Sequence, residues 1–91
     1  MARLLALDIG CGAGLLSESL GRLGLSRVRG IDPTPKCIEL AQEHLNQMLK
    51  VDSSLSTVSY EQTTMEQLIE RGDLGAYDLV CCSEVIEHVN D

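Results

Sequence analysis

The chain has 91 residues, of which 44% are apolar and 2% aromatic, and its formal net charge at pH 7 is −7. This composition predicts one small globular domain with a thin core rather than a disordered chain. The acidic balance, the scattered Lys and Arg residues and the near absence of aromatic rings argue against nucleic acid as a partner. No apolar stretch approaches the roughly 20 residues that span a bilayer, and the first residues lack the pattern of a signal peptide.

Hydrophobic periodicity divides the chain into alternating strands and helices. The predicted strands are residues 4–7, 28–31, 57–62 and 77–83, and the predicted helices are residues 15–23, 34–48 or 34–49, and 65–70. Thr34 and Pro35 offer an N-cap and a first-turn proline for the long helix. His44 falls on the polar side of this helix, where we expect it to be solvated. Polar residues 52–54 predict a loop, and residues 72–76 a turn.

This alternation predicts an α/β fold, a doubly wound parallel sheet with helices on both faces. Such sheets bind ligands beyond the carboxyl ends of their strands, near the point where the strand order reverses. The segments just past those ends are residues 8–14, Asp32, 62–65 and 83–88. We expect these four segments to form one site.

The four cysteines, Cys11, Cys37, Cys81 and Cys82, have neither a CxxC pair nor the spacing of a disulfide framework. We expect them to be reduced, buried thiols that pack as small apolar groups. This usage is typical of an intracellular protein, because disulfides persist in oxidising compartments.

The strongest signal is the glycine loop DIGCGAG at residues 8–14. Its glycines let the backbone turn sharply, and the helix that follows presents free N–H groups to an anion. A nicotinamide-dependent enzyme is a weaker alternative, because its GxGxxG fingerprint needs a glycine where Leu15 stands. Asp8 instead suits a ligand that carries both an ammonium group and a carboxylate.

Asp32 ends the second predicted strand, eighteen residues after Gly14. Its carboxylate could accept hydrogen bonds from both vicinal hydroxyls of a ribose. The alternative is a turn-forming or helix-capping aspartate ahead of Pro33. The glycine loop at the proper spacing favours the ribose interpretation.

Three motifs resemble those of class I S-adenosylmethionine-dependent methyltransferases, namely DIGCGAG at 8–14, GID at 30–32 and YDLV at 77–80. More narrowly, LLSESL from residue 15, GIDP at 30–33 and SEVIEHV at 83–89 are similar to the ubiquinone-biosynthesis O-methyltransferases, which methylate polyprenylated catechols. The resemblance implies a partial Rossmann-like fold of about four strands. Residues 1–91 would then be the S-adenosylmethionine-binding half of a larger domain, with the fourth strand as an apolar edge.

The resemblance also implies roles for individual residues. The cofactor-binding residues would be Asp8, Gly10, Cys11, Gly12, Gly14, Asp32, Thr64, Met65 and Ser83. The glycine loop would hold the methionine moiety, with Asp8 near its ammonium group and Ser83 at the same end. Asp32 would bind the ribose. Thr63 stands in the adenine-contacting segment, where many relatives carry an acidic residue that accepts from the adenine amino group.

A second cluster, Glu84, Glu87 and His88, follows the fourth predicted strand. Helical spacing would place all three on one face, where they could ligate a divalent cation such as magnesium, manganese or zinc. The cation would lower the pKa of a catechol hydroxyl, and Glu87 and His88 are the predicted catalytic residues, with His88 as general base if no metal binds. The alternative is structural, with Glu84 capping a turn and His88 packed beside the sheet.

The activity implied by the resemblance is methyl transfer from S-adenosylmethionine to a catechol or phenol hydroxyl in ubiquinone biosynthesis. The substrate would carry a polyprenyl tail, and the setting would be mitochondrial, at the periphery of the inner membrane or within a biosynthetic complex. A non-catalytic cofactor-binding or interaction module, and another small-molecule methyltransferase, remain alternatives. The exposed sheet edge would also permit an oligomer.

Overall fold

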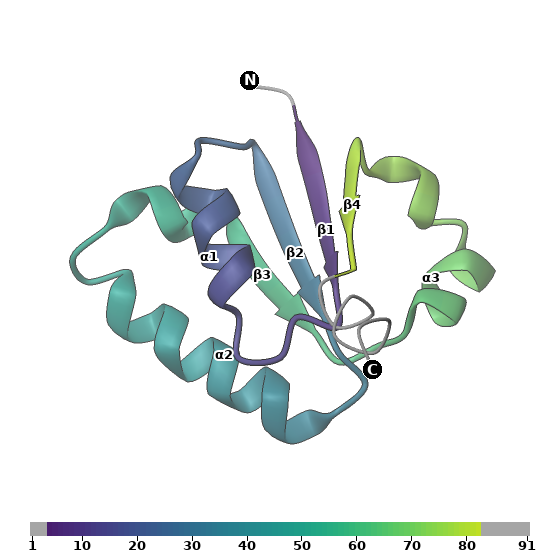
Figure 1. The fold of residues 1–91 in the computed structure, drawn as a ribbon, viewed down its shortest axis with the longest axis horizontal. Coiled ribbons are helices and arrows are strands. Elements are labelled where there is room, and N and C mark those ends of the chain that lie inside the picture. Colours follow the sequence, from purple (N-terminus) through teal and green to yellow (C-terminus); the bar gives the residue numbers. More distant parts are fainter. Residues whose placement is uncertain (1–3, 83–91) are drawn as a thin grey trace, which may run out of the picture.

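All four strands run parallel in one sheet of order β3-β2-β1-β4 in the computed structural model, which describes residues 4–82 (Figure 1). The strands are β1 (Leu5–Ile9), β2 (Arg27–Ile31), β3 (Val58–Glu61) and β4 (Leu79–Cys81). Strand β1 lies between β2 and β4, and the strand order reverses between β1 and β4. The sequence-based prediction of a parallel α/β sheet is confirmed.

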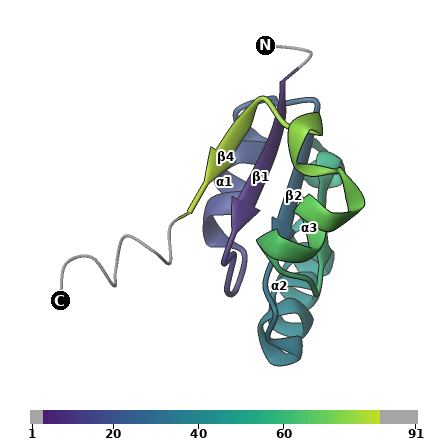
Figure 2. The same cartoon turned by 90° about the vertical axis from the view of Figure 1, so that its right-hand side faces the viewer.

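Helices cover both faces of this sheet (Figure 2). The helices are α1 (Leu15–Arg22), α2 (Pro35–Met48) and α3 (Met65–Arg71). Leu20 of α1 and Leu45 of α2 share one apolar cluster with β1, β2 and β3, whereas Leu68 of α3 packs against Leu7 and Ile31 on the other face. Side chains alternate between the faces of a strand, so β1 and β2 contribute to both clusters.

Some strands and turns begin or end at other residues than the sequence predicts, because backbone hydrogen bonds, not side-chain hydrophobicity, define these elements. Strand β1 continues past its apolar run, so that Asp8 lies inside the strand, opposite Gly30 and Cys81. The predicted loop at 52–54 leads into a 3-10 turn, η1 (Ser53–Thr57), which Asp52 caps by accepting from the Ser54 N–H. The predicted turn at residues 72–76 contains a second 3-10 turn, η2 (Leu74–Ala76).

The cysteines are all free, as predicted, but only Cys11 is buried. Cys37 lies on α2 and Cys81 and Cys82 lie at the β4 edge, and all three are partly exposed. The prediction of buried thiols is therefore wrong for these three, because the described part of the chain places no further layer over them. Within residues 4–82, no helix has the length and hydrophobicity needed to cross a membrane.

Strand β4 is an edge of the sheet as far as residues 4–82 describe it. Its apolar side chains Leu79 and Val80 are 41% and 43% exposed. This agrees with the predicted apolar edge, and it leaves one side of β4 free to hydrogen-bond with a further strand.

Two glycines allow α1 to lie close to the sheet. A Cβ on Gly30 would meet the ring of Tyr60 at 2.7 Å and Ser17 Oγ at 2.8 Å, and a Cβ on Gly14 would collide with the Tyr60 hydroxyl. That hydroxyl donates a hydrogen bond to the Gly14 carbonyl at 3.3 Å. Tyr60 of β3 therefore reaches across β2 to the start of α1.

We expect Gly30→Ala to lower the free energy of unfolding by about 2 kcal/mol, because the added methyl group overpacks the contact with Tyr60 and Ser17. Gly75→Ala is the matched control, since a Cβ there meets nothing within 4 Å. Urea unfolding of both variants measures the difference. Equal stabilities of the two variants would contradict this packing argument.

Candidate functional site

The glycine loop crosses the carboxyl ends of β1 and β2 (Figure 1). The N–H groups of Gly10 and Cys11 both donate to the Ile31 carbonyl, each at 2.9 Å. Gly14 has a φ of +89°, a left-handed conformation that side chains rarely adopt, and it is the N-cap of α1. The loop is therefore built for a sharp turn and is fastened to the end of β2.

Asp32 joins the glycine loop to the start of α2. It is 4% exposed, and its two carboxylate oxygens accept one backbone N–H each, from Gly12 at 3.1 Å and from Thr34 at 2.9 Å. The turn-forming role considered for Asp32 is thus present, whereas the Thr34 side chain makes no capping hydrogen bond. Each carboxylate oxygen can accept a second hydrogen bond, so this role does not exclude a ribose.

Asp8 is fully buried beneath the glycine loop. Its Oδ2 accepts a hydrogen bond from the Ser17 hydroxyl at 2.7 Å, while Oδ1 has no partner among the described residues. Burial raises the pKa of this carboxyl, and the bond from Ser17 opposes that rise. Burial and the charges of Asp8 and Asp32 raise the pKa of the neighbouring Cys11 thiol to about 12, so that it stays neutral.

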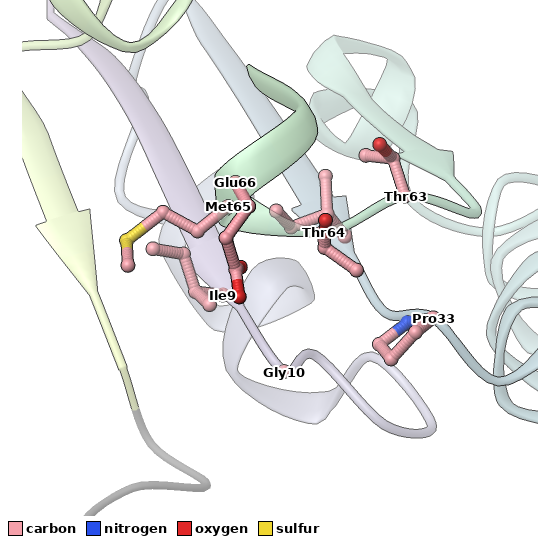
Figure 3. A pocket seen from close by; sticks show the side chains of 8 residues that line it. Ile9, Gly10, Pro33, Thr63, Thr64, Met65 and Glu66 are labelled. Atoms are coloured by element: carbon pink, nitrogen blue, oxygen red, sulfur yellow. The ribbon is translucent and has the colours of Figure 1, made fainter. Parts of the chain in front are cut away.

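A pocket of about 280 Å³ lies beside the loop at the same end of the sheet (Figure 3). Its lining comes from the ends of β1 and β2 and the start of α3, and consists of Ile9, Gly10, Ile31, Pro33, Thr63, Thr64, Met65 and Glu66. Complete small-molecule sites usually occupy about 300–1,000 Å³. The volume and the largely apolar walls therefore suit one flat ring system rather than a whole cofactor.

The two threonines in this lining are engaged within the fold. The Thr64 hydroxyl accepts from the Gln67 N–H at 3.2 Å in a capping box that starts α3, and the Thr63 hydroxyl donates to Gln67 Oε1 at 2.7 Å. Thr63 is only 5% exposed. The Thr63 proton is therefore used within the fold, whereas the Thr64 hydroxyl accepts there and keeps its own proton as a donor.

Glu66 is the pocket residue that the sequence reasoning missed. It is exposed on the first turn of α3, and Figure 3 shows its side chain leaving α3 on the same side as Met65, toward Ile9. The available signal was the start of the predicted helix at residue 65, which places residue 66 in the first turn at the carboxyl edge of the sheet.

Glu18 is a second missed residue. It is 1% exposed on α1, and its carboxylate contacts His44 Nδ1 at 2.6 Å and Arg22 at 3.5 Å. The expectation that His44 is solvated is right in part, since its side chain is 43% exposed, but α2 also brings the imidazole to this carboxylate. The contact between Glu18 and His44 links α2 to α1, the helix that follows the glycine loop.

Comparison with known proteins decides the family. The sequence pattern of a family described as "Methyltransferase domain" matches residues 7–91. The chain belongs to this family. The resemblance seen in the three motifs is confirmed, and the loop, Asp32 and the pocket lie within a methyltransferase domain.

Individual relatives agree with this assignment. The domain is 48% identical over 85 residues to the ubiquinone biosynthesis O-methyltransferase of Methylocella silvestris, and 42% identical over 91 residues to that of Methylobacterium sp. (strain 4-46). These matches cover 93% and 100% of this chain but 30% and 33% of the relatives, so the chain spans about a third of their length. The relatives are bacterial and give no support to the mitochondrial location that the resemblance implies.

A solved structure gives the same result for the fold. The magnesium protoporphyrin IX methyltransferase of Synechocystis PCC 6803, with bound S-adenosylmethionine, matches with a TM-score of 0.71 and 31% identity. The match covers 89% of this chain and 35% of that protein. The partial Rossmann-like fold is confirmed.

The structure thus brings most of the predicted cofactor residues to one end of the sheet. Those within the described residues are Asp8, Gly10, Cys11, Gly12, Gly14, Asp32, Thr64 and Met65. Ser83, Glu84, Glu87 and His88 lie outside residues 4–82, so their roles stay predictions. In the part that is described, no group of three His, Cys, Asp or Glu side chains could hold a metal ion.

We expect Asp8 to titrate above the ordinary aspartate pKa of 3.8, because its carboxylate is removed from water. Protonation then favours the folded state, so the contribution of Asp8 to stability is largest below pH 3.8 and is lost as the pH rises through the raised pKa. Asp52 is the internal control, since hydrogen bonds from Ser54 hold its pKa below 3.8. The pKa values of Asp8 and Asp52 can be measured from the NMR shifts of their carboxyl carbons during acidification. A lower pKa for Asp8 than for Asp52 would contradict the claim that burial controls the titration of Asp8.

Proposed function

We propose that this methyltransferase domain binds S-adenosylmethionine across the carboxyl ends of β1, β2 and β3. Asp8 carries the proposal, because it is a buried carboxylate beneath a glycine loop with one oxygen left without a partner among the described residues. A buried charge of this kind is stabilised by a cationic partner, which the ammonium group of the methionine moiety would supply. The bound cofactor would supply the sulfonium methyl group that is transferred.

The remaining parts of the ligand suit the neighbouring features. The pocket at the start of α3 has apolar walls on which an adenine ring could pack, including Ile9, Pro33 and Met65. Asp32 bonds to Gly12 of the glycine loop and is the chain neighbour of Ile31 and Pro33, which line this pocket, so its free lone pairs would accept from the ribose hydroxyls. The predicted role of Thr64 is better supported as a helix cap that shapes the pocket than as a direct polar contact.

Glu66 is proposed as the acceptor for the adenine amino group. Its carboxylate is exposed and lines the pocket, whereas the Thr63 hydroxyl is committed to Gln67. A carboxylate accepts hydrogen bonds but donates none when ionised, so it favours the amino group of adenine over the 6-oxo group of hypoxanthine. Glu66 would therefore select adenosine over inosine.

For the reaction, we propose methyl transfer to a catechol or phenol hydroxyl in ubiquinone biosynthesis, on a substrate with a polyprenyl tail. The support is that the relatives, which the chain matches over about a third of their length, are ubiquinone biosynthesis O-methyltransferases. Glu87 and His88 remain the proposed catalytic residues, and Glu84, Glu87 and His88 the proposed ligands of a divalent cation such as magnesium. A peripheral membrane location, or a place in a biosynthetic complex, belongs to the same proposal.

We propose as a second candidate a non-catalytic cofactor-binding module that pairs with another protein or another copy through Leu79 and Val80, which are exposed at the β4 edge within residues 4–82. The two candidates differ in their products. Methyl transfer to a phenolic acceptor supports the enzyme. Retained cofactor affinity in a stable oligomer without transfer to any phenol supports the module.

We expect this chain to bind S-adenosylhomocysteine saturably in a calorimetric titration, and Asp32→Ala to weaken binding by about 2 kcal/mol, roughly thirtyfold, through loss of hydrogen bonds to the ribose. Asp52→Ala is the matched control, because Asp52 also accepts from the N–H two residues ahead but lies away from the pocket. The control should bind as wild type does. A folded wild-type chain that does not bind would overturn the proposed function.

We expect Glu66→Ala to weaken S-adenosylhomocysteine binding about fivefold, the order of one solvent-exposed hydrogen bond. Binding of S-inosylhomocysteine, which lacks the amino group, should be unchanged or improved. Glu70→Ala, an exposed carboxylate on the same helix, is the control. Equal losses for both ligands would remove Glu66 from adenine recognition.

A further inference from the structure

Ser17 occupies a fully buried position on the first turn of α1. Its hydroxyl donates to Asp8 Oδ2 at 2.7 Å, and among the described residues no other group bonds to this carboxylate. A hydroxyl has one proton to donate, so the bond to Asp8 fixes its orientation.

The surroundings hold Ser17 in place. Ser17 Oγ lies 2.8 Å from the position that a Cβ of Gly30 would occupy, and the Tyr60 ring lies 2.7 Å from the same point. Tyr60 also donates to the Gly14 carbonyl, directly before α1. Burial raises the pKa of the Tyr60 hydroxyl, so it stays protonated and remains a donor. The space left by the missing Gly30 side chain is thus shared by Ser17 and Tyr60.

We propose that Ser17, held by Tyr60 and Gly30, is a positioning residue that aligns the Asp8 carboxylate toward the ammonium group of the cofactor. The inference rests on the proposed function and deepens it. Ser17 donates its hydrogen bond to Asp8 Oδ2, whereas Asp8 Oδ1 has no partner among the residues described. Ser17 also stabilises the ionised form of Asp8, because a hydrogen bond to a carboxylate offsets part of the cost of its burial.

The test compares two ligands that differ only in the group Asp8 would recognise. S-adenosylhomocysteine has the amino group, and deamino-S-adenosylhomocysteine lacks it. We expect Ser17→Ala to weaken binding of the first about tenfold, the scale of one charge-assisted hydrogen bond, and to leave binding of the second unchanged. Ser19→Ala is the matched control on the same helix, since its hydroxyl is exposed and bonds only to the Leu15 carbonyl.

The outcomes separate the inference from the proposed function. Equal weakening of both ligands by Ser17→Ala would mean a structural role only and would overturn the inference. Failure of the folded wild-type chain to bind either ligand would overturn the proposed function itself. If Ser17→Ala does not fold by circular dichroism, Ser17→Cys carries the test, because a thiol of similar shape is a weaker donor and should give a smaller loss confined to the ligand with the amino group.

Discussion

The carbonyl of Ile31 is the point on which the arrangement of the site depends. It receives the N–H groups of both Gly10 and Cys11 at 2.9 Å and so binds the start of the glycine loop to the end of β2. Asp32 extends this attachment by accepting from Gly12 on one side and from Thr34 on the other. Because the ends of β1 and β2 are joined in this way, the loop, the carboxylate and the start of α2 have one fixed relative position.

The buried carboxylates of Glu18 and Asp8 differ in how their negative charge is compensated. Glu18 has basic partners in His44 and Arg22, and it links α1 to α2. Asp8 is fully buried, and within residues 4–82 the hydroxyl of Ser17 is its one hydrogen-bond partner. A carboxylate with incomplete compensation destabilises the fold, and proteins retain such groups where a ligand completes the pairing. This contrast is the reason to place function at Asp8 and structural support at Glu18.

The two ends of the site have opposite character. The pocket at the start of α3 is largely apolar, with Glu66 as its charged group, whereas Asp8 and Asp32 concentrate negative charge near the glycine loop. A ligand with a flat aromatic base at one end and an ammonium group at the other matches this division. Strand β4, the edge of the sheet within residues 4–82, lies on the far side of β1 from β2, and its Cys81 pairs with Asp8.

The sequence by itself determined the alternation of strands and helices, the parallel sheet, the glycine loop and the family, because these follow from local periodicity and from a motif that is contiguous in the chain. It also placed Asp8 and Asp32 at the site. Only the tertiary structure showed that Asp8 lies inside β1, that Asp32 bonds to the loop and that His44 meets Glu18. It alone distinguished Glu66, which faces the pocket, from Thr63, which bonds to Gln67. The physical reason is that strand pairing and helix packing join residues distant in sequence, and hydrogen-bond partners are fixed only when those elements meet.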